Sequence, residues 1–383
     1  MNLGVYIHTP FCKVRCPYCD FVTTDREDLH TLHRAGYVTT LRREWALRRE
    51  RHPEIAGAHL RSVFFGGGTP NLLRADEVKS LLKDIFASVE SVPSDCEVTM
   101  EMNPGVTDAA ALRELRAAGI TRASLGVQST HDRLLQGLGR DHSAEDARQA
   151  FRDARAAGFD NVNVDLMFAV PGQSLADWDE TLAEVASWAP EHVSAYNLTA
   201  KDQTPLAAQV ARGEIVLPGE AKQHAMFERA HGMLTAAGYE HVEISNYAKP
   251  GRACVHNGDV WRGEPYLGIG LGAHSCFGGE RFWNTAAWDE YFKAIAAGEM
   301  PTRVDEDRDD AGKLLEDVYL GLRTREGVDF AAMKSRHGVD LLATRANAVK
   351  DLVEEGLAAL ENGSLRLTLK GWAVTDAVVT ALV

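Results

Sequence analysis

The segment Cys12-Lys-Val-Arg-Cys16-Pro-Tyr-Cys19 follows directly on a short apolar run, Gly4–His8. A large chain with only six cysteines is not read as a disulfide framework, so the clustered thiols indicate a metal or redox site. Three thiolates leave one position open at a tetrahedral zinc ion, and they can also hold three irons of a 4Fe–4S cluster, leaving the fourth iron open to a ligand. The spacing alone leaves three hypotheses: a cluster, a zinc site completed by His8, or three unrelated buried cysteines.

Apolar runs that alternate with helical patterns predict the architecture around this segment. The expected strands are Gly4–His8, Ser62–Phe65, Glu97–Met102, Ala123–Val127, Val162–Met167 and Val193–Leu198. The expected helices are Tyr37–Arg51, Asp76–Val89, Asp108–Ala118, Ala144–Ala157 and Leu175–Trp188. This alternation predicts an α/β fold with a parallel sheet, and six units suit an open, partial (β/α)6 barrel. In such folds functional residues gather at the C-terminal ends of the strands.

The last part of the chain predicts a C-terminal α+β module that is winged-helix-like. The expected helices are Leu314–Leu322, Phe330–Arg336, Leu341–Glu355 and Trp372–Leu382, and a hairpin of Leu357–Leu360 and Leu365–Leu369 turns at Asn362-Gly363. Residues 301–383 carry 11 basic and 15 acidic side chains, a net charge of −4, which disfavours DNA binding. We expect a partial barrel over residues 1–240, a connecting segment over 241–300 and a C-terminal domain over 301–383.

The composition limits the partners of the chain. Its 383 residues include 41 basic and 55 acidic side chains, and the formal charge of −14 argues against non-specific binding to nucleic acid or anionic membrane. No window approaches the ~18 uncharged apolar residues of a membrane span. The start, Met1-Asn-Leu-Gly-Val5, lacks the basic and apolar regions of a secretory signal. We expect a cytoplasmic protein without an integral membrane segment.

Several expected strands end in residues that suit a ligand. The run Gly66-Gly-Gly68-Thr69 lets the backbone come close to a bound group. Glu101 can accept hydrogen bonds, and Arg140 can pair with a carboxylate in a two-pronged fork. Asp165 lies inside an apolar run, where an ionised carboxylate needs a partner. Taken singly, each has a plain alternative, such as an ordinary turn, a solvated strand end or a surface arginine.

The cysteine segment, preceded by Tyr6-Ile-His8-Thr-Pro-Phe11 and followed by Asp20-Phe21, resembles the signature of the radical S-adenosylmethionine (SAM) superfamily. The resemblance implies that Cys12, Cys16 and Cys19 hold a 4Fe–4S cluster and that SAM chelates the open iron. Electron donation from the reduced cluster into the sulfonium of SAM then yields a 5′-deoxyadenosyl radical. The cofactors carry this chemistry, and the protein places them.

From Tyr6 to its C-terminus the chain is similar to the oxygen-independent coproporphyrinogen III oxidase group, and within it to the HemW branch of heme chaperones. The resemblance implies that eight residues bind SAM: Tyr6, Tyr18, Gly68, Thr69, Glu101, Gln128, Arg140 and Asp165. It assigns no catalytic residue.

The segment Cys254-Val-His256-Asn257-Gly-Asp-Val260-Trp261 resembles the pattern His-Asn-x-x-Tyr-Trp, which that branch links to heme binding. The resemblance implies heme beside His256, Asn257 and Trp261. A neutral imidazole such as His256 can ligate heme iron, and Cys254 is a rival ligand. Val260 stands where the branch has tyrosine, so a contact from that hydroxyl is missing.

Two features favour a chaperone over an oxidase. The oxidases carry a fourth cysteine two residues after the third, where this chain has Phe21, and an N-terminal extension that would leave Cys12 further from the start. We expect a protein that binds a 4Fe–4S cluster, SAM and heme and delivers heme to apo-hemoproteins. Its electron donor is unknown, and the resemblance implies a homodimer. The alternatives are a decarboxylating coproporphyrinogen III oxidase, another radical SAM enzyme such as a methylase, and a structural zinc protein.

Overall fold

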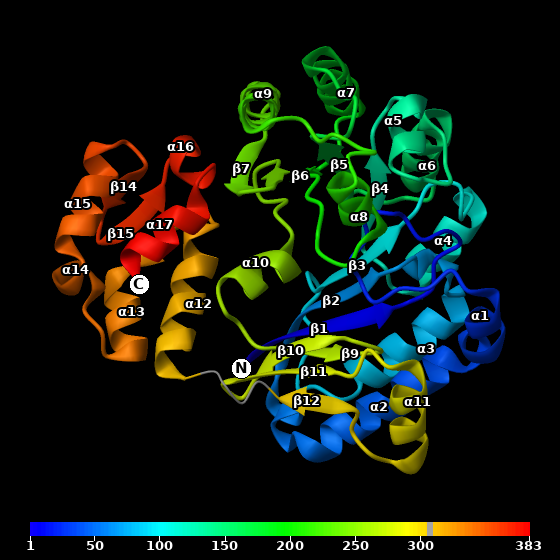
Figure 1. Ribbon diagram of the computed structural model, residues 1–383. Helices are drawn as coiled ribbons and strands as arrows, with labels where there is room; N and C mark the ends of the chain where they lie inside the picture. Colours follow the sequence, from blue (N-terminus) through cyan, green and yellow to red (C-terminus); the bar gives the residue numbers. More distant parts are fainter. Residues whose placement is uncertain (305–308) are drawn as a thin grey trace.

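One large curved sheet with helices along its outer side dominates the computed structural model, which describes residues 1–304 and 309–383 (Figure 1). Its strands are β1 (Asn2–Thr9), β2 (His59–Gly67), β3 (Glu97–Met102), β4 (Arg122–Gln128), β5 (Val162–Phe168), β6 (His192–Asn197), β7 (Glu240–Glu243), β8 (Asn246–Ala248), β9 (Tyr266–Ile269), β10 (His274–Phe277), β11 (Glu280–Asn284) and β12 (Thr302–Val304). Their order is β12-β11-β10-β9-β1-β2-β3-β4-β5-β6-β8-β7. Strands β1 to β6 pair in parallel in chain order, which confirms the predicted partial barrel.

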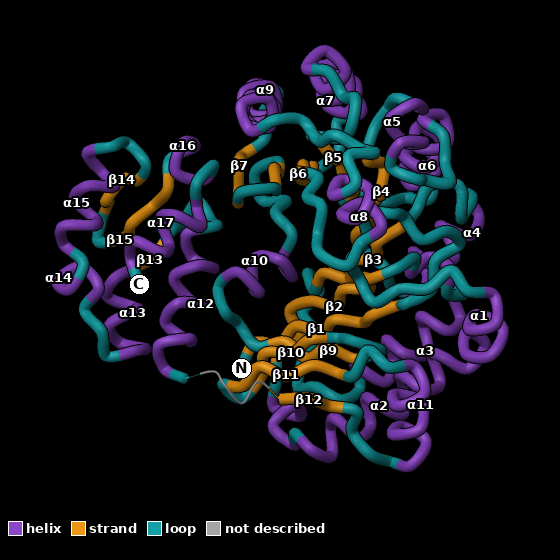
Figure 2. The backbone as a smooth tube through the Cα atoms, viewed as in Figure 1, coloured by secondary structure: helices purple, strands orange, loops and turns teal. Residues whose placement is uncertain are grey.

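The helices of this part of the chain are α1 (Glu27–His33), α2 (Tyr37–Arg51), α3 (Ala75–Phe86), α4 (Ala109–Ala118), α5 (Asp132–Gly137), α6 (Ala144–Ala156), α7 (Leu175–Trp188), α8 (Pro205–Ala211), α9 (Glu220–Ala236), α10 (Val255–Trp261) and α11 (Trp288–Ala297). Most of them cover the outer face of the sheet, whereas α10 lies on its inner side (Figure 2). Capping boxes at Ser143 and Ser174 start α6 and α7. Gly119, at φ 119°, ends α4 in the left-handed conformation. Fully buried Trp45 and Trp178 anchor α2 and α7 in the core.

The expected connecting segment, residues 241–300, contributes strands to this sheet. β9 pairs in parallel with β1, and β10, β11 and β12 continue the sheet in antiparallel order. These strands are three to five residues long, and Tyr266–Ile269 leads into a glycine-rich turn. Such short strands carry little periodic signal, which is why the sequence did not reveal them. The boundaries at 240 and 300 stay a prediction.

The C-terminal module has its own small antiparallel sheet and core. It contains α12 (Asp310–Leu322), β13 (Val328–Asp329), α13 (Phe330–His337), α14 (Leu341–Thr344), α15 (Ala346–Glu354), β14 (Ala358–Glu361), β15 (Ser364–Leu367), α16 (Leu369–Trp372) and α17 (Thr375–Leu382). The order β13-β15-β14 includes the hairpin predicted at Asn362-Gly363, where both residues have positive φ. The helix expected over Leu341–Glu355 is interrupted at Arg345, and the last helix begins only at Thr375.

The module attaches to the β7 edge of the large sheet, beyond α10 (Figure 1). Ile244 N–H donates to Arg323 O at 3.0 Å, and Arg325 N–H donates to Val242 O at 3.2 Å. In the described part of the chain, no helix is long and apolar enough to cross a membrane.

Candidate functional site: two cavities inside the sheet

The loop that carries the three thiols is closed at its base by backbone hydrogen bonds. Cys12 N–H donates to Thr24 O at 2.9 Å, and Thr24 N–H donates to Pro10 O at 2.8 Å. The turn after β2 joins the same base, because Gly68 N–H donates to Thr9 O at 2.7 Å. The loop therefore starts from a fixed point at the C-terminal ends of β1 and β2.

His8, in β1, holds the C-terminal part of this loop by a hydrogen bond. Its Nε2–H donates to Val22 O at 2.8 Å, since a carbonyl only accepts, and Nδ1 then accepts from Tyr6 OH at 3.1 Å. Burial lowers the pKa of His8 to about 4, so the ring is neutral. Both ring nitrogens are engaged, which leaves no lone pair of His8 for the zinc ion of the alternative hypothesis.

A cavity of about 400 Å³ opens above the loop at the C-terminal ends of β2 to β6. Its lining includes all three cysteines and six of the eight expected SAM-binding residues: Cys12, Cys16, Cys19, Tyr18, Gly68, Glu101, Gln128, Arg140 and Asp165. Tyr6 and Thr69 lie just outside its lining. The Thr69 hydroxyl accepts from Asn103 Nδ2 at 3.1 Å, so it supports a residue that does line the cavity.

Two half-buried carboxyl groups lie on the barrel side of this cavity. Glu101 accepts from Gly67 N–H at 3.0 Å, and Asp165 accepts from Ser124 Oγ at 3.1 Å and from Asn163 Nδ2 at 2.8 Å. Burial, reinforced by the charge of Asp165, raises the pKa of Glu101 to about 8. Burial also raises the pKa of Asp165. Without a ligand, Glu101 holds a proton at neutral pH.

Arg140 connects the thiol loop with the strand ends. Its Nη2 donates to Asn103 Oδ1 at 2.8 Å and to Gly126 O at 3.1 Å, and Nη1 lies 3.7 Å from Cys16 Sγ. A register shift between Leu125 and Gln128 bends β4, and Gln128 adopts the left-handed region at φ 64°. Bulges of this kind re-aim a side chain next to active sites.

Three observations show that this site fits the implied cofactors. First, Gln128 Oε1 and Arg140 Nε are buried with no hydrogen-bond partner in the described residues, and such atoms call for a bound ligand. Second, a Cβ on Gly68 would lie 2.9 Å from Cys12 Sγ and 2.7 Å from Phe11 O, so only glycine fits beside the thiol. Third, thiolates are the donors that Fe–S clusters use.

Within residues 1–304 and 309–383, no three His, Cys, Asp or Glu side chains are close enough together to share one metal ion.

The structural likeness to solved proteins concerns the fold. Coproporphyrinogen III oxidase (HemN) from Escherichia coli superposes with a TM-score of 0.82 at 22% identity, over 99% of this chain and 89% of that one. The pattern of the Radical SAM superfamily matches residues 6–185, and that of the HemN C-terminal domain matches residues 310–374.

Among curated relatives, "Heme chaperone HemW" of Mycobacterium tuberculosis is 36% identical over 99% of this chain and 94% of its own length. The chain belongs to the radical SAM superfamily, in its HemN/HemW group. HemW of Bacillus subtilis is 32% identical over 96% of each chain. The bovine relative, "Radical S-adenosyl methionine domain-containing protein 1, mitochondrial", is 32% identical over 99% of this chain and 87% of its own. Membership in this superfamily implies a 4Fe–4S cluster and SAM.

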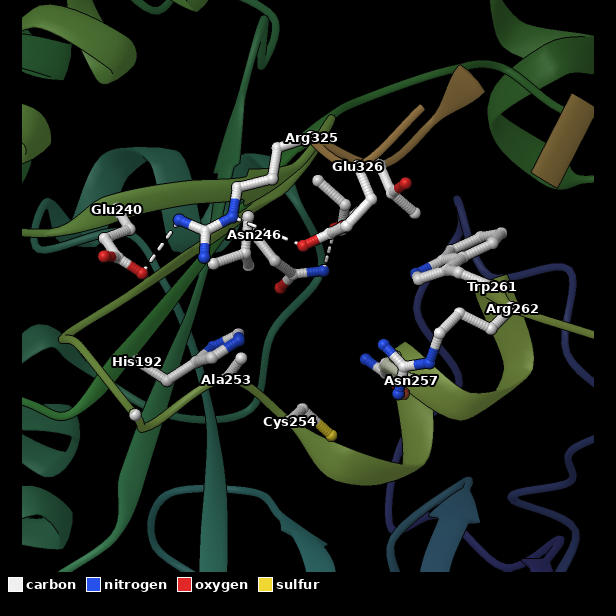
Figure 3. Close-up of a pocket in the computed structure, with 15 residues that line it drawn as sticks. His192, Glu240, Asn246, Ala253, Cys254, Asn257, Trp261, Arg262, Arg325 and Glu326 are labelled. Carbon is white, nitrogen blue, oxygen red and sulfur yellow. Dashed lines mark hydrogen bonds and ion pairs between the residues drawn. The ribbon is translucent and has the colours of Figure 1, made fainter. Parts of the chain in front are cut away.

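The segment that resembles the HemW heme pattern forms α10, which borders a second cavity of about 300 Å³ (Figure 3). Asn257 and Trp261, one turn apart, both face this cavity. His256 faces the opposite way, into the barrel, where its Nδ1 pairs with Ser62 Oγ at 2.9 Å and its ring stacks on Phe64 at 5.1 Å. The structure therefore brings two of the three expected heme residues together and separates the third.

Sequence reasoning did not single out Asn103 in the first cavity or His192 in the second. The side-chain amide of Asn103 is hydrogen-bonded to Thr69 and Arg140, and His192 is the first residue of β6. Asn103 follows the rule that functional residues lie at the C-terminal ends of barrel strands, whereas His192 lies at the N-terminal end of β6, where that rule predicts no site. His192 belongs to no motif in the sequence. Only its place in the same cavity as Trp261, which the sequence does not show, makes it a candidate.

Proposed function

We propose that this protein is a heme chaperone of the radical SAM superfamily, which binds heme in the second cavity and hands it to an apo-hemoprotein. The observation that carries the proposal is the lining of that cavity. Trp261 offers a flat apolar face, and Trp261 Nε1, Glu243 Oε2 and Asn246 Oδ1 are buried without partners in the described residues. A cavity with several unsatisfied polar atoms suits a ligand. The names of the HemW relatives suggest that this ligand is heme.

The first cavity supports this role with its own residues. Cys12, Cys16 and Cys19 would hold the cluster, whose chemistry is one-electron donation to the sulfonium of SAM. Gln128 Oε1 and Arg140 Nε offer an acceptor and a donor to the bound SAM, and Glu101 can accept hydrogen bonds from ribose hydroxyls once it has lost its proton. At the position of the oxidases' fourth cysteine, Phe21 is 59% exposed and lines the same cavity, so no fourth thiol is present there.

A hemin titration tests the proposal. The purified full chain should give a Soret band, and adding a heme-free hemoprotein should move that band to the acceptor's spectrum. Trp261→Ala should weaken hemin binding about tenfold, because stacked aromatic contacts contribute roughly 1–1.5 kcal/mol or more. Trp283→Ala on β11, outside both cavities, is the matched control. Absence of a Soret band in the wild-type titration contradicts the proposal.

An anaerobic assay distinguishes the proposed chaperone from the oxidase alternative. The reconstituted protein is mixed with SAM, a reductant and coproporphyrinogen III, and the porphyrins are separated by chromatography. We expect no decarboxylated product. Formation of that product at catalytic turnover would replace the chaperone proposal with the oxidase.

A further inference from the structure

The second cavity lies where three parts of the chain meet: the start of β6, the β7–β8 edge, and α10 with the C-terminal module (Figure 3). Figure 3 shows the His192 ring and Cys254 on the barrel side, with Trp261 on α10 and Arg325 from the C-terminal module on other sides of the cavity. His192 and Cys254 are two lining side chains that could ligate iron through nitrogen or sulfur. His256 is absent from this lining.

His192 is held with one nitrogen available. Its Nδ1 lies 2.7 Å from Asn163 Oδ1, an oxygen that can only accept, so Nδ1 carries the proton. Asn163 is itself fixed, because its Nδ2 donates to Ser124 Oγ at 2.7 Å and to Asp165 Oδ1 at 2.8 Å. Nε2 of His192 is therefore an unprotonated acceptor, and in the described residues no hydrogen bond engages it. An imidazole that donates its second N–H to a fixed acceptor is the usual arrangement of a histidine that binds metal.

Electrostatics agree with this geometry. Burial, reinforced by the charge of Arg122, lowers the pKa of His192 well below its usual range, so the ring stays neutral. Cys254 is in the opposite state. Its Sγ–H donates to Glu97 Oε1 at 3.3 Å, and burial raises the pKa of the thiol. A thiolate at this position would face the Glu97 carboxylate, so the imidazole is the better ligand.

His256 is neutral for the same reason as His192, but it does not line the second cavity. Its Nδ1 pairs with Ser62 and its ring is covered by Phe64 and Tyr6 inside the barrel, at centroid distances of 5.1 and 6.4 Å. Its backbone N–H is bound to Glu97 at 3.3 Å. These contacts anchor α10 to the barrel wall and leave Asn257 and Trp261 turned toward the cavity. His256 acts as a positioning residue for α10.

We propose that His192, through Nε2, is the axial ligand that the second cavity offers to heme iron, in place of His256. The inference rests on the proposed heme function. It adds a ligand from β6 to the aromatic and amide groups of α10, so that heme iron would be attached to the barrel while Trp261 covers the porphyrin from α10.

Hemin titration of the full chain with free-imidazole rescue tests the inference. His192→Gly should weaken hemin binding at least tenfold and shift the Soret maximum, and millimolar imidazole should restore the wild-type spectrum by occupying the vacated position. Rescue separates loss of a ligand from misfolding. As a second variant, His192→Met replaces the imidazole with a thioether, a different axial ligand that should move the band without abolishing it. His256→Ala loosens α10 and should weaken hemin binding, but it should keep the wild-type Soret position, and so should Cys254→Ser, because neither variant removes the proposed ligand.

The outcomes separate this inference from the proposed function. If the wild type binds hemin and His192→Gly keeps the same band and affinity, the ligand assignment is wrong and the heme function stands. Loss of the band in His256→Ala, with His192→Gly unaffected, also overturns it in favour of His256. If the wild type itself binds no hemin, the proposed function fails and the ligand assignment fails with it.

Discussion

Cys12 and Glu101 are both kept in their neutral forms by burial inside the first cavity. The pKa of the Cys12 thiol rises to about 11 and that of the Glu101 carboxyl to about 8. Iron binds thiolates, so assembly of a cluster must release the proton of Cys12. Cys12 and Glu101 therefore add negative charge to this site only after they have released their protons.

The thiols give the first prediction at this scale. Replacing Cys12, Cys16 or Cys19 with alanine should remove nearly all bound iron and acid-labile sulfide after anaerobic reconstitution, because each thiolate holds a separate iron. Cys96→Ala is the control, since Cys96 lies outside both cavities. Full iron content in any of the three variants would show that its thiol is not a ligand.

Glu101 gives a second prediction, on the pH dependence of stability. Between pH 4.5 and about 8 the folded state holds a proton that the unfolded chain has released, so stability falls as pH rises through this window. Glu101→Gln keeps the shape of the side chain but cannot ionise. Its advantage over the wild type, measured by urea unfolding, should therefore grow by about 2 kcal/mol from pH 5 to pH 8.5, less than the full pKa shift because the carboxyl borders an open cavity.

Exposed Glu299→Gln is the control for the pH experiment, since it should follow the wild type at every pH. The other titrating groups are shared by all three proteins, and their contributions cancel in the comparison except for that of Asp165, whose charge interacts with Glu101. Parallel pH curves for the wild type and Glu101→Gln would contradict the raised pKa of Glu101.

At the scale of elements, the ends of β1, β2 and β4 shape the first cavity. The turn after β2 is bonded to the base of the thiol loop, and the bulge in β4 turns Gln128 toward the ligand site. The C-terminal parts of β1 and β2 pair regularly up to Thr9 and Gly67, whereas β4 shifts its register before Gln128, which lines the cavity.

Gly68 carries the prediction at this scale. Gly68→Ala places a methyl group 2.7 Å from Phe11 O and 2.9 Å from Cys12 Sγ, so the thiol loop must move. We expect a loss of about 1–3 kcal/mol in unfolding free energy and a several-fold loss of reconstituted iron. Gly57→Ala, where a methyl group meets nothing within 4 Å, is the matched control. Unchanged iron content in Gly68→Ala would show that the loop does not depend on this close approach.

At the scale of the whole molecule, buried polar groups join parts of the chain that lie far apart in sequence. Glu44 on α2 accepts from Gly270 N–H at 2.8 Å, from Asn284 Nδ2 at 2.7 Å and from Tyr291 OH at 2.7 Å. Arg48, one turn further along α2, donates to Asn284 Oδ1 at 2.7 Å. This network ties the β9–β12 part of the sheet to the first β/α unit.

Removing Glu44 should be strongly destabilising. Glu44→Ala leaves the buried guanidinium of Arg48 without its carboxylate, and we expect a loss of about 3–5 kcal/mol in unfolding free energy. Adding Arg48→Met should recover part of that loss, because the unpaired charge is gone. Asp28→Ala, which breaks an exposed pair with Arg26, should cost at most about 1 kcal/mol. Denaturant unfolding measures all four proteins. A Glu44→Ala loss no larger than that of Asp28→Ala would contradict the structural role of the network.

Most residues of the first cavity could be predicted from the sequence, because they lie at the ends of strands whose hydrophobic periodicity is visible. Glu101, Gln128 and Asp165 follow recognisable apolar runs, and parallel strands bring their C-terminal ends to one edge. For the second cavity, the sequence predicted two of the three expected heme residues, Asn257 and Trp261, correctly as lining residues. The motif on α10 named three neighbouring residues, but successive residues of a helix point about 100° apart, so His256 and Asn257 cannot face the same way.

The sequence by itself determined the parallel β/α units, the C-terminal hairpin and the thiol loop, because periodicity, turn chemistry and cysteine spacing are local properties of the chain. Only the tertiary structure decided that β9 to β12 complete the sheet, that His256 enters the barrel wall, and that His192 meets Trp261 across a cavity. Those outcomes depend on which surfaces pack together, and packing joins residues whose separation along the chain carries no local signal.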